Sequence, residues 1–73
     1  MKYTYEIKFF NNSFTVIESR NELMFGGLRK IESKWKKQQF FSTEPYWGLS
    51  EIGIASWNRS KEWLTVNHPE LVL

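Results

Sequence analysis

The sequence predicts an α+β fold, in which an N-terminal β-hairpin packs on an amphipathic basic helix and further strands follow. Three observations lead to this prediction. Residues 3–18 alternate apolar and polar side chains around an Asn-Asn pair, residues 19–37 repeat apolar side chains at helical spacing, and short apolar runs separated by turn formers follow. A chain of 73 residues has the length of one domain, so we expect residues 1–73 to form a single domain.

The N-terminal segment is predicted to be a two-stranded hairpin. Between residues 3 and 9, Tyr, Ile and Phe side chains alternate with Thr, Glu and Lys, which is the period of a half-buried strand. Asn11 and Asn12 tolerate the positive φ angles of a two-residue turn. A turn there makes the apolar faces of both strands coincide, which fixes the register. The predicted cross-strand pairs are Phe9 with Phe14, Ile7 with Val16, Lys8 with Thr15, and Tyr5 with Glu18.

A helix is predicted to follow and to cover the apolar face of the hairpin. Ser19 and Glu22 have the spacing of a capping box. Within residues 24–35, apolar side chains recur at intervals of four, three and four residues, as on one side of a helix. Gly26-Gly27 disturbs this pattern, because a glycine inside a helix costs about 1 kcal/mol relative to alanine. The segment is therefore either one helix that approaches the strands closely at Gly27 or two shorter helices.

This predicted helix carries a concentrated positive charge. Between Arg29 and Lys37 there are five basic side chains and one acidic one, although the formal net charge of the whole chain is only +2. Four of the basic residues share the exposed side of the helical wheel: Arg29, Lys30, Lys36 and Lys37. One interpretation is an ordinary solvated surface. The other is a contact with phosphate groups or with an acidic partner.

The C-terminal half permits two structures. Residues 38–43 are predicted to form a short strand. Beyond it, the chain forms either a hairpin of strands 52–57 and 62–67, or a helix that Ser50 caps and that ends near Val66, before Pro69. The hairpin is the preferred prediction because several residues in this segment are poor or indifferent helix formers. They are Gly53, Ser56, Asn58, Ser60 and Thr65.

Aromatic residues are unusually frequent, at 18% of the chain, and include four tryptophans. One interpretation is that large rings enlarge the core of a small protein that has no disulfides. The other is that some rings are exposed and anchor a partner, since exposed aromatic residues are typical of binding surfaces. The candidate anchors are Tyr46, Trp47, Trp57 and Trp63.

The sequence contains no residue pattern typical of an enzyme or of a metal site. It has no cysteine and one histidine, His68, which excludes thiolate ligands and histidine clusters. No serine occupies a glycine-flanked nucleophile elbow, and Gly26-Gly27 lacks the pattern of a phosphate-binding loop. We therefore expect a protein without enzymatic activity, catalytic residues, metal or cofactor.

These features predict a cytoplasmic binding protein. A strand pattern follows Met1 directly, no apolar run reaches the length of a membrane span, and the absence of cysteine suits a reducing compartment. The function predicted first is regulation or inhibition of another protein through exposed aromatic residues. One alternative is nucleic-acid binding through the basic helix face. Another is a homodimer formed through a free strand edge or an aromatic patch.

Overall fold

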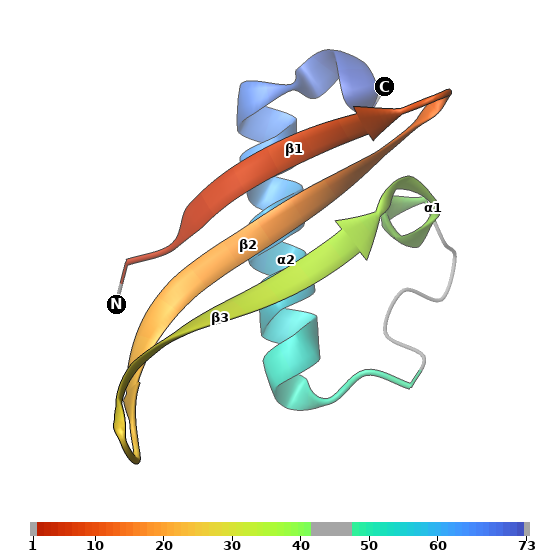
Figure 1. The fold of residues 1–73 in the computed structure, drawn as a ribbon. Coiled ribbons are helices and arrows are strands. Elements are labelled where there is room, and N and C mark those ends of the chain that lie inside the picture. The colour runs from red at the N-terminus through yellow and green to blue at the C-terminus, as the bar shows by residue number, and fades with distance from the viewer. Residues whose placement is uncertain (1, 42–47, 73) are drawn as a thin grey trace.

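The chain, described by a computed structural model over residues 2–41 and 48–72, folds into an antiparallel sheet crossed by one long helix (Figure 1). The sheet has three strands in the order β1-β2-β3. The elements are β1 (Thr4–Phe10), β2 (Ser13–Met24), β3 (Gly27–Lys36), α1 (Lys37–Phe40), α2 (Glu51–Asn67) and the 3-10 turn η1 (Pro69–Leu71). The predicted α+β class is confirmed.

The N-terminal hairpin has the predicted register. Ile7 pairs with Val16, Phe9 with Phe14, Lys8 with Thr15, and Tyr5 with Glu18. Asn11 has a positive φ of 55°, whereas Asn12, the other predicted turn residue, does not have a positive φ. The predicted register is correct because the alternation of side chains and the turn residues are both local, and they agree with each other.

The predicted helix over residues 19–37 is wrong, because residues 19–36 form the second half of β2, a tight turn and β3, and Lys37 begins α1. Gly26 and Gly27 have φ angles of 97° and 122°, which only glycine adopts at little cost. The apparent helical stripe is split between the faces of the sheet, with Leu28 on one face and Ile31 and Trp35 on the other. Glycine conformation and strand pairing therefore outweigh the helical spacing.

The predictions for the C-terminal half are also corrected. Residues 37–40 form the short helix α1 in place of the start of a strand, and the preferred C-terminal hairpin is replaced by the helix α2. The Ser50 hydroxyl accepts a hydrogen bond of 3.1 Å from the Gly53 N–H, which is the capping role in the alternative prediction. Ser56 and Ser60 are buried, so packing against the sheet outweighs their weak helix propensity.

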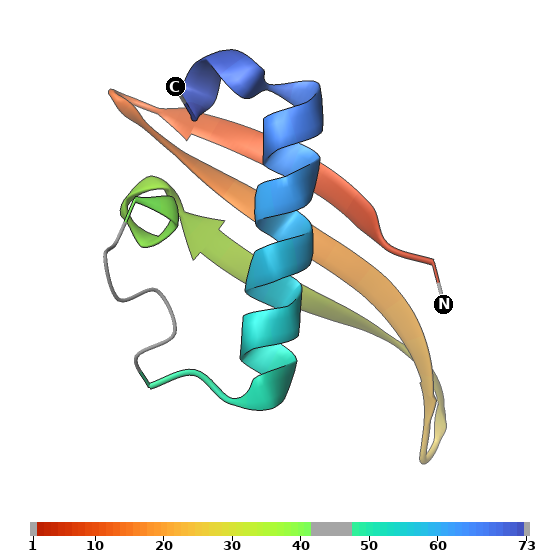
Figure 2. The same ribbon diagram turned by 180° about the vertical axis from the view of Figure 1, so that it is seen from behind.

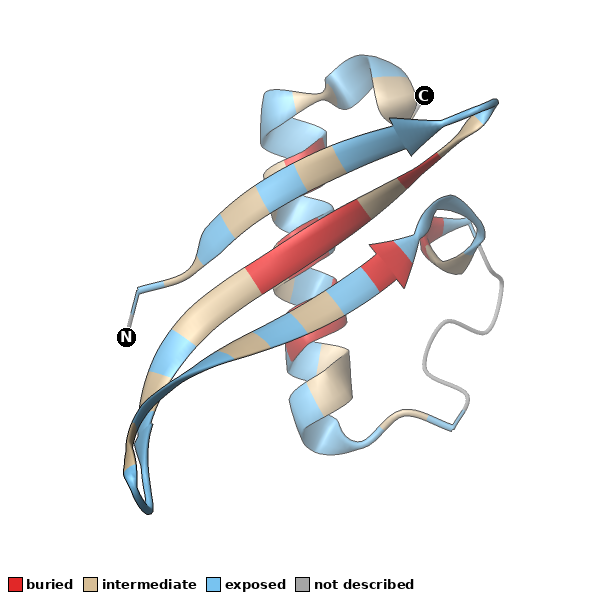
Figure 3. Cartoon of the chain, in the orientation of Figure 1, coloured by how far each residue is buried: buried red, intermediate tan, exposed pale blue. Residues whose placement is uncertain are grey.

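Helix α2 covers one face of the sheet, and no described element covers the other (Figures 1 and 2). The buried residues gather where α2 crosses the middle of β2 (Figure 3). The core consists of Phe14, Val16, Trp35, Phe40, Trp57 and Leu64. Three of its aromatic rings form a continuous stack, with ring centroids 6.3 Å apart between Phe14 and Phe40 and 6.1 Å apart between Phe40 and Trp57.

Candidate functional site

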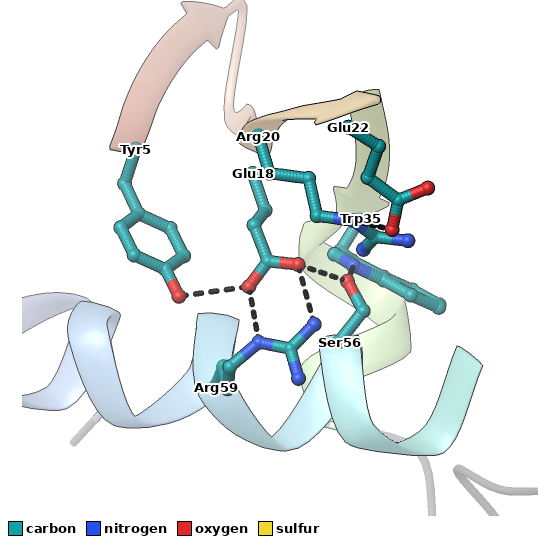
Figure 4. A network of polar contacts seen from close by, with 7 residues as sticks. All are labelled: Tyr5, Glu18, Arg20, Glu22, Trp35, Ser56 and Arg59. Atoms are coloured by element: carbon teal, nitrogen blue, oxygen red, sulfur yellow. Dashed lines mark hydrogen bonds and ion pairs between the residues drawn. The ribbon is translucent and has the colours of Figure 1, made fainter. Parts of the chain in front are cut away.

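A buried polar cluster joins α2 to the sheet (Figure 4). Glu18 in the middle of β2 is 2% exposed, and its carboxylate accepts hydrogen bonds from four donor atoms. Arg59 donates two bonds of 2.9 Å, Tyr5 donates one of 2.7 Å, and the Ser56 hydroxyl donates one of 2.9 Å. Trp35 Nε1 in turn donates to the Ser56 hydroxyl at 3.1 Å. The cluster satisfies a carboxylate that would otherwise be costly to bury.

The charges of this cluster are fixed by its own contacts. Burial alone would raise the pKa of Glu18, but hydrogen bonds from Arg59, Tyr5 and Ser56 hold it below its usual value. Burial and the bond to Glu18 raise the pKa of the Tyr5 hydroxyl, and the bond to Glu18 raises the pKa of Arg59. At neutral pH, Glu18 and Arg59 are therefore charged and Tyr5 is neutral. Since the carboxylate is enclosed, this arrangement fastens the helix and offers no open acid or base to a substrate.

The β2–β3 hairpin extends past α2 as an arm (Figures 1 and 2). The residues around its turn are apolar. We define the arm tip as Leu23, Met24, Phe25 and Leu28. Leu23 is 83% exposed, Leu28 is 68% exposed, and Phe25 is fully exposed. None of the four belongs to the core or packs against it. A group of neighbouring apolar side chains that the fold does not bury is typical of an interaction site.

The turn that forms the arm tip also positions positive charge. An atom added at the Cβ position of Gly26 would lie 3.6 Å from Nη2 of Arg29, so the guanidinium lies beside the turn. Arg29, Lys30 and Ile31 join Met24 and Phe25 around an open groove of about 430 Å³. The arm therefore presents an apolar tip with basic side chains directly behind it.

The uncovered face of the sheet, here called the open face, is basic. Strand alternation and cross-strand register place Lys8, Lys30, Lys34 and Lys36 on it, and Lys2 lines a hollow there together with Lys30. The acidic residues on this face are Glu6 and Glu32. Within the described part of the chain, no ion pair neutralises these lysines.

The predicted basic group is thus divided, because it lies on strands and not on a helix. Lys30 and Lys36 are on the open face, whereas Arg29 alternates to the face that α2 covers. Lys37 begins α1, and its Nζ donates to the Asn12 carbonyl at 3.2 Å. The structure therefore keeps two of the four residues, Lys30 and Lys36, on the same face of the sheet.

The predicted aromatic anchors are also separated. Trp57 is buried in the core, and its Nε1 donates to the Gln39 carbonyl at 3.0 Å, so a partner cannot reach its ring. Trp63 is half-buried and stacks on Tyr5, with ring centroids 5.3 Å apart. Tyr46 and Trp47 lie outside the described residues.

The arm tip is the part of the site that sequence reasoning missed. The predicted helix places two of its residues, Met24 and Leu28, in the apolar stripe that faces the hairpin. The signal that identifies them is Phe25-Gly26-Gly27 itself, because two adjacent glycines between apolar segments are typical of a hairpin turn.

Comparison with protein-family models, with curated proteins and with solved structures finds no match to this chain. None of the helices described here is both long and apolar enough to cross a membrane. Over residues 2–41 and 48–72, no three His, Asp or Glu side chains are grouped so that they would hold a metal ion.

Proposed function

We propose that this chain is a small binding protein that docks the arm tip into an apolar pocket of a partner protein and regulates or inhibits that partner by covering its surface. One observation carries the proposal: four neighbouring apolar side chains are exposed at the end of a projecting hairpin. They replace the tryptophans of the sequence-based hypothesis as anchors.

The arm tip has the properties of a binding anchor. Complete burial of one Leu or Phe side chain contributes about 1.5–3 kcal/mol, and a few such residues commonly dominate the affinity of an interface. Cross-strand pairing holds Leu23 directly opposite Leu28, so the backbone of the tip is ordered before binding. This preorganisation lowers the entropy cost of association.

The charge behind the tip indicates the chemistry of the partner. Arg29 and Lys30 line the same groove as Phe25. We expect an apolar pocket on the partner with acidic side chains at its rim, since complementary charge orients an encounter and speeds it. We also expect this binding to take place in the cytoplasm, where a chain without cysteine loses nothing through the absence of disulfides.

The experiment compares affinity capture by three forms of the chain from cells that express it naturally. In the tip variant, Leu23→Ser, Phe25→Ser and Leu28→Ser are combined. The control is Ile52→Ser, which removes from α2 an apolar side chain that is as exposed as Leu28, at 68%. We expect the natural chain and the control to retain one partner that the tip variant loses, with at least a tenfold weaker Kd for the purified pair.

Two outcomes would contradict the proposal. The first is capture of the same proteins by the tip variant. The second is binding of the natural chain to vesicles of anionic lipid that the tip variant abolishes, with no protein partner found, because an apolar tip with basic flanks also suits a membrane surface.

The basic open face supports nucleic-acid binding as a second candidate function. Lys8, Lys30, Lys34 and Lys36 share this face with the exposed ring of Phe10, which offers a stacking surface. Replacing the four lysines with glutamine should abolish a shift of labelled single strands or duplexes. Duplex affinity should fall log-linearly with salt, at a slope of about 0.9 per phosphate neutralised. The absence of any shift at low salt would remove this candidate.

A further inference from the structure

Strand β1 is an edge of the sheet that the described part of the chain leaves uncovered. β1 pairs with β2 on one side only, and its substantial contacts are with β2. Alternate residues of an edge strand direct their N–H and C=O groups outward, where they accept another strand.

The sequence of β1 is complementary to itself. When two copies of Thr4–Phe10 pair in antiparallel orientation about Ile7, Glu6 of each copy lies opposite Lys8 of the other. Both residues lie on the open face, where their side chains are free to meet. Opposite charges in directly facing positions stabilise a strand pair.

The other edge strand, β3, lacks this property. Its basic residues Arg29, Lys30, Lys34 and Lys36 outnumber Glu32, so two copies of β3 would repel each other. Lysines on an edge strand commonly prevent unwanted pairing. Charge therefore disfavours pairing between two copies of β3 and leaves β1 as the edge available for pairing.

A groove beside β1 fits the same register on the side of α2. It has a volume of about 290 Å³, and its lining includes Tyr5, Trp63 and Val66. Val66 is 73% exposed and Phe9 is 62% exposed. Pairing about Ile7 places Phe9 of the second copy directly opposite Tyr5 and on the face that carries this groove.

We propose that two copies of this chain form a homodimer through β1, with a twofold axis at Ile7. The two sheets then join into one of six strands, Phe9 of each copy enters the groove of the other, and Glu6 pairs with Lys8 at two symmetric positions. This surface is separate from the arm tip, so a result that contradicts the dimer does not contradict the proposed binding function, and the reverse also holds.

Charge reversal tests the register. Sedimentation over a concentration series should show a monomer–dimer equilibrium, and Lys8→Glu should raise the dimer Kd roughly tenfold or more, because two attractive pairs become repulsive. Combining Lys8→Glu with Glu6→Lys should restore the natural Kd. The control Lys34→Glu on β3 should leave it unchanged. A natural chain that stays monomeric, or a dimer that Lys8→Glu does not weaken, would overturn the proposal.

The absence of cysteine in the natural chain permits a second test. Residues directly opposite in such a strand pair have Cβ atoms about 4.5–5.5 Å apart, which a disulfide can bridge with a small adjustment, whereas diagonal neighbours lie about 7–8 Å apart. A mixture of Glu6→Cys and Lys8→Cys chains, distinguishable by mass, should therefore oxidise mainly to the mixed disulfide. A mixed yield no greater than the combined yield of the two self-linked products, as random pairing gives, would contradict the register.

Discussion

Glu18 is the single residue on which the attachment of the helix to the sheet most depends. Its carboxylate receives bonds from β1 through Tyr5 and from α2 through Ser56 and Arg59. Glu18→Ala should lower the free energy of unfolding by about 3 kcal/mol, near the low end for a buried ion pair because the Arg59 side chain is 30% exposed and can regain water. Urea denaturation measures this loss. A change below about 0.5 kcal/mol, typical of surface substitutions, would show that the cluster contributes little.

Two buried serines of α2 provide a matched comparison. Ser56 joins Glu18 and Trp35 by hydrogen bonds, whereas the buried Ser60 hydroxyl has no partner within the described part of the chain. Ser56→Ala should cost about 1–3 kcal/mol, because two buried polar groups lose a partner. Ser60→Ala should be neutral or stabilising, because it removes an unpaired hydroxyl and raises helix propensity. Thermal denaturation measures the stability of both variants. Equal losses of stability in the two variants would contradict the assigned roles.

The stability that Glu18 contributes should depend on pH. Its folded pKa lies below the unfolded value, so the contribution is present above the unfolded pKa of about 4.3 and is lost as pH falls through the folded pKa. The difference in unfolding free energy between the natural chain and Glu18→Gln should therefore shrink as pH drops below about 4. A difference that stays constant from neutral to acidic pH would show that ionisation of Glu18 is irrelevant.

At the scale of the elements, the turn between β2 and β3 distinguishes the observed strands from the predicted helix. Gly27 has a φ of 122°, so Gly27→Ala should cost about 1–3 kcal/mol through backbone strain. In a helix, the same change would stabilise by about 1 kcal/mol. The control is Gly53→Ala in α2, where a new Cβ meets its nearest atom at 3.5 Å, an ordinary contact, and stabilisation is expected. Denaturant titration of both variants gives the sign of each change in unfolding free energy.

The elements differ in how far the sequence predicts them. The first hairpin follows from local information, because Asn11-Asn12 and the alternating side chains agree. The segment from Ser19 to Trp35 does not, since its apolar spacing suits a helix while its glycines require a turn. Local propensity disfavours helix α2 because Ser56 and Ser60 are weak helix formers. Their burial against a distant strand cannot be seen in a local pattern.

At the scale of the whole molecule, the structure separates the residues that the sequence analysis groups as candidate binding sites. The frequency of aromatic residues and the concentration of basic residues between Arg29 and Lys37 are visible in the sequence, but the surfaces on which these residues lie are not. Trp57 completes the core, and Arg29 and Lys30 lie on opposite faces of one strand. Their placement depends on the order β1-β2-β3, which follows only once residues 27–36 are known to form a strand.

The most direct test of the central claim is photo-crosslinking from the arm tip in cells that express the chain naturally. A photoreactive phenylalanine analogue at position 25 should yield a covalent adduct with one other protein, and adding Leu23→Ser and Leu28→Ser should abolish it. The same analogue at Ile52, which is exposed on α2 and lies outside the arm tip, should not form this adduct. An analogue at position 25 that links no protein beyond those linked from position 52, or only a second copy of the chain, would contradict the claim that the arm binds a partner protein.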